Sequence, residues 1–255
     1  MNDQVAILIT TIDREPLLIE TVSNVLGNLP DNATIIVGDQ SRKYSKEKVE
    51  LYTQLEDHGS GKGVVLPQKY DIGLSQARNE LVDCAHALGF KYCLLSADSI
   101  RFTHKYDFTD QFKLFDSDSS VGIIGFHLEG SQGDWFRDLE LVPGKHFLLT
   151  KPKRALADGR FQRVDIVKNF FLAKTECLLE NRWDPELKMT EHEDYFYRLK
   201  QLGKWKVYYD PKLSGKHIRD RKDMAYVALR TRCYNQFKEV LQRKYNLSGW
   251  VVCNP

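Results

Sequence analysis

The stretch Lys91–Ile100, K-Y-C-L-L-S-A-D-S-I, joins a short apolar run to a single carboxylate, Asp98. The run Tyr92–Leu95 is brief and bounded, which is typical of a buried strand. An isolated aspartate at the end of a strand usually caps the next turn. Whether Asp98 does more depends on the side chains that the rest of the chain brings to the same place.

The residues before this stretch alternate between strand and helix patterns. Val5–Thr11 and Ala33–Val37 are continuous apolar runs rich in β-branched residues, and Val64–Leu66 is a shorter one. Such runs predict central parallel strands. Apolar residues at helical spacing fill the intervals, over residues 15–28, 44–57 and 73–88. This order predicts a doubly wound parallel sheet, which binds ligands at the carboxyl ends of its strands.

The second half of the chain continues with more mixed patterns. A helix is predicted over Thr190–Leu202, where Gly203 stops it, and a long basic helix over 221–245. Further strands are predicted over residues 121–126, 164–175 and 205–210. No low-complexity linker separates the two halves, so we expect them to form one domain.

The composition excludes several classes of protein. The 255 residues carry a formal net charge of +2, which gives no reason to expect a nucleic-acid partner. The five cysteines are widely spaced without a C-x-x-C pair, which argues against a disulfide framework or a zinc site and for a reducing compartment. The N-terminus lacks a basic segment, and no apolar stretch is long enough to span a membrane. We therefore expect a cytoplasmic protein.

Two aspartates follow predicted strands of the sheet, Asp39 and Asp98. In a parallel sheet both carboxylates point into one crevice, where one can accept a hydrogen bond from a nucleobase and the other can hold a divalent cation against a diphosphate. His217 follows a later strand; alone it would be an ordinary loop residue, but beside such a cation it could be an imidazole ligand.

Two other segments contain reactive side chains. Glu191, Glu193 and Asp194 crowd the first turn of one predicted helix. Favourable interaction with the helix dipole would need only one acid, and crowding raises a carboxyl pKa toward the range of a general base. Arg78 and Asn79 begin another helix, where they either face water or bind phosphate oxygens.

These segments together resemble a GT-A type glycosyltransferase of the family 2 group, over residues 5–217. The resemblance lies in I-L-I-T-T-I-D-R, I-I-V-G-D-Q-S, G-L-S-Q-A-R-N, L-L-S-A-D-S-I and E-H-E-D-Y-F-Y-R-L. The segment N-F-F-L-A-K-T followed by W-D-P-E-L is most similar to β-1,4-N-acetylgalactosaminyltransferases and their microbial relatives. The order and spacing of the motifs are more specific than any one of them.

The resemblance implies a Rossmann-like, mostly parallel twisted sheet flanked by helices. It also implies an inverting transfer of a sugar from a nucleotide sugar, here a UDP-sugar, to a hydroxyl of a glycan or lipid-linked acceptor, as in polysaccharide biosynthesis. Asp194 would be the catalytic base with Glu193 beside it. The implied donor-binding residues are Thr10, Thr11, Arg14, Asp39, Arg78, Asn79 and Asp98.

The metal motif departs from that of the relatives. Where they have D-D-D or D-x-D, this chain has Ala97-Asp98-Ser99. Asp98 and His217 would then hold Mn²⁺ or Mg²⁺ together with the donor diphosphate. The alternative is that basic residues replace the metal.

The resemblance divides the chain into a transferase domain, 1–217, and a C-terminal basic helical extension, 218–255. Residues 1–103 would bind the nucleotide sugar and 104–217 the acceptor. Acceptor contacts are expected from Trp135, Trp183 and Asn169, because sugar rings stack on aromatic faces. The extension either packs on the core or touches the inner face of a membrane beside a lipid-linked acceptor.

The main rival interpretation is a non-catalytic GT-A module that binds a glycan or a partner, which only the altered metal motif favours. The first strand is followed by T-T-I-D-R-E-P, without glycine. A sugar-phosphate nucleotidyltransferase or a nucleotide-dependent dehydrogenase would need a glycine-rich loop there, so both are rejected.

Overall fold

The computed structural model describes residues 4–28, 30–57, 62–130, 136–152, 156–157, 160–218 and 224–253. Its strands are β1 Val5–Thr11, β2 Ala33–Asp39, β3 Gly63–Pro67, β4 Tyr92–Ala97, β5 Ile100–Phe102, β6 Val121–Glu129, β7 Asp138–Val142, β8 His146–Thr150, β9 Leu156–Ala157, β10 Phe161–Val164, β11 Phe171–Lys174, β12 Lys206–His217 and β13 Val251–Cys253. Its helices are α1 Glu15–Gly27, α2 Lys46–Asp57, α3 Leu74–Ala87, α4 Thr109–Ser117, α5 Thr175–Glu180, α6 Glu191–Leu202 and α7 Met224–Tyr245. The predicted helices and strands have counterparts here, except that only the ends of the strand pattern predicted over residues 164–175 are strands, in β10 and β11, and that residues 221–223 of the predicted C-terminal helix lie outside the described residues.

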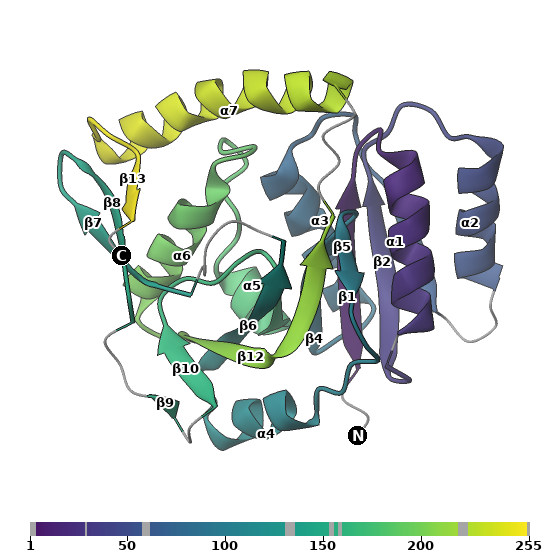
Figure 1. The fold of residues 1–255 in the computed structure, drawn as a ribbon, viewed down its shortest axis with the longest axis horizontal. Helices are drawn as coiled ribbons and strands as arrows, with labels where there is room; N and C mark the ends of the chain where they lie inside the picture. Colours follow the sequence, from purple (N-terminus) through teal and green to yellow (C-terminus); the bar gives the residue numbers. More distant parts are fainter. Residues whose placement is uncertain are drawn as a thin grey trace.

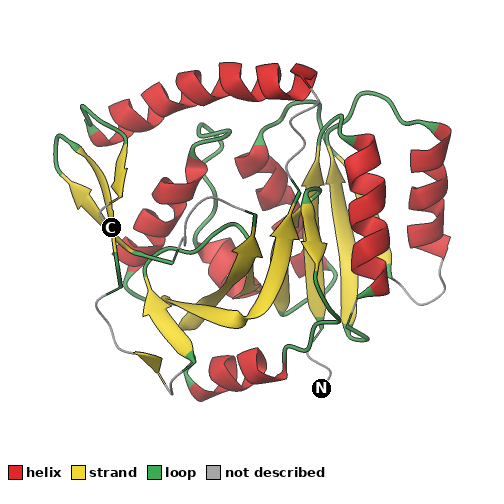
Figure 2. Ribbon diagram, viewed as in Figure 1, coloured by secondary structure: helices red, strands yellow, loops and turns green. Residues whose placement is uncertain are grey.

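The central sheet is mixed rather than wholly parallel. Its order is β3-β2-β1-β4-β11-β6-β12-β10-β9, with β5 paired to β12. The four strands from β3 to β4 are parallel, whereas β11 runs antiparallel to both of its neighbours. Helices cover both faces of the sheet (Figure 2). The predicted fold class, a mostly parallel α/β sheet flanked by helices, is confirmed.

The register of the first strands brings polar residues to one edge of the sheet. Thr11 pairs with Asp39 of β2, and Thr10 pairs with Ala97 of β4. All seven residues of β1 are buried, as expected for a strand covered on both faces. Asp98 follows β4 immediately, so the carboxyl ends of β1, β2 and β4 are level and their side chains meet there.

Helix α3 starts at the same edge. Gly73 precedes it with a φ of 92°, in the region that favours glycine, and a Cβ there would lie 2.5 Å from the side chain of Lys188. The close approach lets the amide of Leu74 donate to the carbonyl of Lys188 at 3.0 Å. It fixes the start of α3 against the loop that leads into α6.

The C-terminal segment packs on the rest of the molecule. Helix α7 crosses the molecule above the carboxyl ends of the central strands (Figure 1), with Phe237 and Leu241 buried beneath it. After it, β13 joins β8 in parallel and extends the β7–β8 pair into a second sheet. The apolar side of α7 therefore faces the core, and membrane contact by the segment stays a prediction. No helix in the described part of the chain has the length and apolar character to cross a membrane.

Candidate active site

A cavity of about 510 Å³ lies at the edge where β1, β2 and β4 end. This volume is in the range of small-molecule sites, and the place is where open α/β sheets bind ligands. Predicted site residues on its wall are Thr10, Thr11, Arg14, Arg78, Asp98, Asn169, Glu193 and His217. The fold thus brings together residues that are up to 207 positions apart in the chain, from Thr10 to His217.

The carboxylate of Asp98 is held from two sides. Thr11 Oγ1 donates a 2.9 Å hydrogen bond to Oδ2, and Arg14 Nη1 lies 2.7 Å from Oδ1. The hydroxyl of Thr21 also donates to the main-chain carbonyl of Asp98. Burial raises the pKa of the Asp98 carboxyl to about 6, although Arg14, Thr11 and Arg230 act in the opposite direction.

These contacts bear on the expected divalent cation. Both oxygens of Asp98 already accept hydrogen bonds from Thr11 and Arg14, and a guanidinium repels a cation at the same carboxylate. His217 is the other expected ligand, and it lines the same cavity. Within the described residues, no group of three His, Cys, Asp or Glu side chains could hold a metal ion. The residues do not fit a cation held by the protein alone.

Asp39 does not reach the cavity. Its side chain is fully buried, 2.6 Å from Lys48 Nζ, and the Tyr52 hydroxyl donates to it at 2.5 Å. The expected contact of Asp39 with a nucleobase is therefore replaced by an internal ion pair. Its neighbour Gln40 lines the cavity instead.

Arg78 and Asn79 diverge, although they are adjacent on α3. Arg78 lies on the cavity wall with Nη1 2.5 Å from Glu191 Oε1. Asn79 Nδ2 donates to the carbonyl of Trp183 at 2.8 Å, and Asn79 Oδ1 accepts from the Trp183 amide at 3.0 Å. It fixes the loop before α6 and does not face the cavity, contrary to the expectation that it binds the donor.

The first turn of α6 presents Glu191, His192 and Glu193 to the cavity. Glu191 is paired with Arg78, so its negative charge is already compensated. His192 Nδ1 lies 3.0 Å from Asn169 Oδ1, and burial lowers the pKa of its imidazole to about 4, which keeps the ring neutral. Asn169 thus lies on the wall and orients a cavity side chain.

Glu193 has the properties of a general base. It is 5% exposed, and no cation among the described residues forms an ion pair with it. Burial raises the pKa of its carboxyl to about 7, and the charge of Glu191 acts in the same direction. A base with a pKa near neutral pH suits general-base catalysis at that pH.

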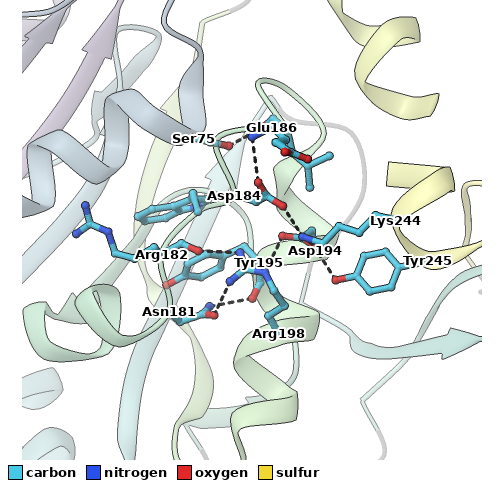
Figure 3. Close-up of polar contacts among 12 residues, drawn as sticks. Ser75, Asn181, Arg182, Asp184, Glu186, Asp194, Tyr195, Arg198, Lys244 and Tyr245 are labelled. Atoms are coloured by element: carbon cyan, nitrogen blue, oxygen red, sulfur yellow. Dashed lines mark hydrogen bonds and ion pairs between the residues drawn. The ribbon is translucent and has the colours of Figure 1, made fainter. Parts of the chain in front are cut away.

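Asp194, the base expected from the sequence, points away from the cavity. Figure 3 shows its carboxylate between α6 and α7, in contact with Arg198, Lys244 and Tyr245. Arg198 Nε lies 2.9 Å from Oδ2, while Lys244 Nζ and the Tyr245 hydroxyl both lie 2.7 Å from Oδ1. Glu193 lines the cavity, whereas the packing of α6 against α7 directs the next side chain to Arg198 and Tyr245. The structure corrects the assignment of Asp194: it joins two helices.

Among the described residues, the aromatic side chains that line the cavity are not the ones expected to contact the acceptor. Trp183 is 1% exposed and stacks on Tyr195 with ring centroids 4.4 Å apart, so it belongs to the core. Trp135 lies outside the described residues. The aromatic side chains that do line the cavity are Tyr226, Tyr234 and Trp250, from the C-terminal segment.

These aromatics and Arg230 were missed because α7 was interpreted as an appendage. A signal was present in the sequence: Tyr226, Arg230 and Tyr234 are spaced four residues apart, which places them on one side of a helix. Nothing in the sequence indicated that this side faces the cavity.

The chain is similar to solved structures of GT-A type glycosyltransferases. It matches the mannosyltransferase PcManGT from Pyrobaculum calidifontis, in complex with GDP-Man and Mn²⁺, with a TM-score of 0.62 and 11% identity. It also matches two structures of S. aureus TarS. The TM-score is 0.59 and the identity 15% for the first, and for TarS 1–349 the TM-score is 0.58 and the identity 13%. No protein-family model and no curated protein matches the chain.

The fold is GT-A. The matches cover 95% of this chain or more, but the chain spans only 65% of the mannosyltransferase and 44% of TarS. Identities of this size show the fold alone. The similarity to N-acetylgalactosaminyltransferases expected from the motifs is not among these findings.

Proposed function

We propose that the protein transfers a sugar from a nucleotide-sugar donor to a hydroxyl group of a glycan or glycolipid, with the cavity as its active site. The observation that supports this best is Glu193, a buried carboxyl with a pKa of about 7 on the wall of the same cavity as the Asp98–Arg14 pair. Glycosyl transfer needs a base to accept the acceptor proton and a cationic group to stabilise the leaving diphosphate. Both lie in one cavity, at the edge of the sheet where β1, β2 and β4 end.

The cationic groups of the cavity suit a diphosphate. Arg14, Arg78 and Arg230 all line it. Arg14 is paired with Asp98 and Arg78 with Glu191, whereas Arg230 forms no ion pair among the described residues. Guanidinium groups bind phosphate oxygens in a planar, two-donor geometry. We place the donor diphosphate among them, with the nucleoside toward Thr10, Thr11 and Gln40.

The reaction follows from these positions. Glu193 accepts the proton of the acceptor hydroxyl, and the acceptor oxygen forms a bond to the anomeric carbon. The bond from that carbon to the diphosphate oxygen breaks, and the nucleoside diphosphate leaves with the electron pair. Attack from the face opposite the leaving group inverts the anomeric centre. Arg14 and Arg230 stabilise the charge that develops on the leaving phosphate, and Asp98 orients Arg14.

If Mn²⁺ or Mg²⁺ were delivered with the donor, Asp98 and His217 would be the residues that contact it. Such a cation would neutralise diphosphate charge. Arg230 lines the cavity without a carboxylate partner among the described residues, and we infer from its free positive charge that nucleotide binding does not depend on a metal.

The donor is proposed to be a UDP-sugar, and UDP-N-acetylhexosamines are the first candidates, because the motif resemblance to N-acetylgalactosaminyltransferases includes the segment 169–175. GDP-mannose is the matched alternative, since the neighbouring mannosyltransferase was solved with GDP-Man.

The experiment is a nucleotide-release assay with UDP-GlcNAc, UDP-GalNAc, UDP-glucose, UDP-galactose and GDP-mannose, each tested with and without a mixture of simple glycosides. Lys46→Ala is the control for Arg230→Ala, because Lys46 is an exposed cation on α2 with a side chain 86% accessible. We expect release from one donor, lowered in Arg230→Ala and unchanged in Lys46→Ala. No release from any donor, with no binding of UDP or GDP, would favour the non-catalytic glycan-binding module.

A further inference from the structure

The C-terminal segment contributes a stripe of side chains to the cavity. Tyr226, Arg230 and Tyr234 follow one another at intervals of four residues on α7. Trp250 lies in the loop directly before β13. All four line the cavity, although they come from the last 30 residues of the chain. The segment is therefore part of the site.

The stripe has a donor end and a far end. Arg14, which pairs with Asp98, lies over the ring of Tyr226 at 4.3 Å, and Arg230 donates to the Tyr226 hydroxyl at 3.3 Å. A helix rises 1.5 Å per residue, so Tyr234 lies about 12 Å further along α7. Glu193 lines the same cavity as Tyr234, and its charge, after burial, raises the pKa of the Tyr234 hydroxyl.

The two aromatic residues at the far end are not core residues. Tyr234 is 44% exposed and Trp250 is half-buried. Their ring centroids are 5.5 Å apart and the planes are inclined by 38°, so the rings diverge and do not stack closely. The position of Trp250 is fixed by its main chain, because its carbonyl accepts a 2.9 Å hydrogen bond from the amide of Phe147. Two partly exposed aromatic rings in a cavity wall, one of them fixed in position, are suited to binding a flat apolar face.

We propose that Tyr234 and Trp250 form the acceptor subsite and bind the apolar face of a neutral pyranose ring, with one ring hydroxyl directed to Glu193. The inference rests on the proposed function, because Glu193 is there the base that accepts the acceptor proton. It assigns to the C-terminal segment a direct role in acceptor binding. The ring CH groups of a pyranose supply the apolar face, and Trp and Tyr supply area with few rotatable bonds.

The test uses the full chain and saturation-transfer NMR of methyl glycosides of glucose, galactose, GlcNAc, GalNAc and mannose, in the presence of UDP. The variants are Tyr234→Ala, Trp250→Ala and Trp250→Phe, and Leu202→Ala is the control because Leu202 is 51% exposed at the opposite end of α6. Calorimetric titration of UDP into each variant checks the donor end and the fold independently.

We expect at least one glycoside to bind the wild type, with about two- to tenfold weaker binding in Tyr234→Ala and Trp250→Ala, the range for loss of one aromatic contact. Trp250→Phe retains most binding, and UDP affinity stays unchanged throughout. Glycoside binding that is equal in all variants, or absent from a wild type that binds UDP, overturns the subsite and leaves the proposed function standing. Glycoside binding that depends on Trp250 in a chain that binds neither UDP nor GDP supports the subsite and overturns the proposed function.

Discussion

Glu193 and Asp194 are adjacent acids to which the structure gives different roles, and their amide variants separate these roles. Glu193→Gln keeps the shape of the side chain and removes a carboxyl with no described ion pair. General-base help is worth about 10²- to 10⁴-fold in rate, so this variant should lose turnover by that factor while its melting temperature stays the same or rises. The rise is expected because burial disfavours the ionised carboxyl that the amide replaces.

Asp194→Asn should behave in the opposite way. It removes the charge that binds Arg198, Lys244 and Tyr245. Removing one partner of a fully buried pair costs about 3–5 kcal/mol, but Arg198 and Lys244 are 29% and 30% exposed. We therefore expect a loss of about 2–3 kcal/mol. That corresponds to a fall in melting temperature of about 4–12 °C.

The assay measures melting temperature by calorimetry and nucleotide release per folded molecule, well below the melting transition. Glu193→Gln should lose turnover without losing stability, and Asp194→Asn should lose stability while keeping turnover within about tenfold, less than general-base loss would give. The reasoning is refuted if Asp194→Asn melts like the wild type and is inactive while Glu193→Gln is active. Asp83→Asn is the control for the loss of one negative charge, because Asp83 forms an exposed ion pair with Arg182 at the surface.

Three further predictions concern pH, metal and the buried pair of α2. The ratio kcat/KM should rise with pH through about 7 as Glu193 ionises. Because the folded-state pKa of Glu193 lies above its unfolded value, the free energy of unfolding of the wild type minus that of Glu193→Gln should fall between about pH 4.5 and 7; a flat difference over that interval, measured by urea titration, would contradict this. Nucleotide binding should persist in EDTA because Arg230 supplies a positive charge that no described carboxylate pairs with, and complete loss in EDTA with recovery in Mn²⁺ would show that this charge is insufficient. Lys48→Met should lower the free energy of unfolding by about 3–5 kcal/mol, because it leaves the fully buried carboxylate of Asp39 without its cation; Lys46→Met, an exposed change on the same helix, should have little effect.

The part of the fold that positions the donor end could be predicted from the sequence. Val5–Thr11 is apolar along its whole length because β1 is covered on both faces, and Asp98 follows the strand beside it. Parallel strands in register place their carboxyl ends together, which is why Thr11 and Asp98 meet. The antiparallel direction of β11 could not be predicted, since a short apolar strand has the same pattern in either direction.

Side-chain direction was the main part that the sequence left undetermined. Glu193 and Asp194 are chemically alike and adjacent, and only the packing of α6 decides which faces the cavity. Trp183 was expected to contact the acceptor because sugar rings stack on aromatic faces, yet it fills the core against Tyr195. The position of α7 over the strand ends depends on tertiary contacts such as the 2.9 Å bond from Thr190 to the carbonyl of Phe237, which no local pattern encodes.

The central claim, that this cavity binds a nucleotide diphosphate through its arginines, is tested most directly by isothermal titration of UDP and then GDP into the wild type and Arg230→Ala, each with and without Mn²⁺. The account predicts saturable binding of one nucleotide without Mn²⁺, and binding weaker by about tenfold or more in Arg230→Ala, as expected for loss of one charged contact. Absence of binding for both nucleotides, with and without Mn²⁺, would contradict it.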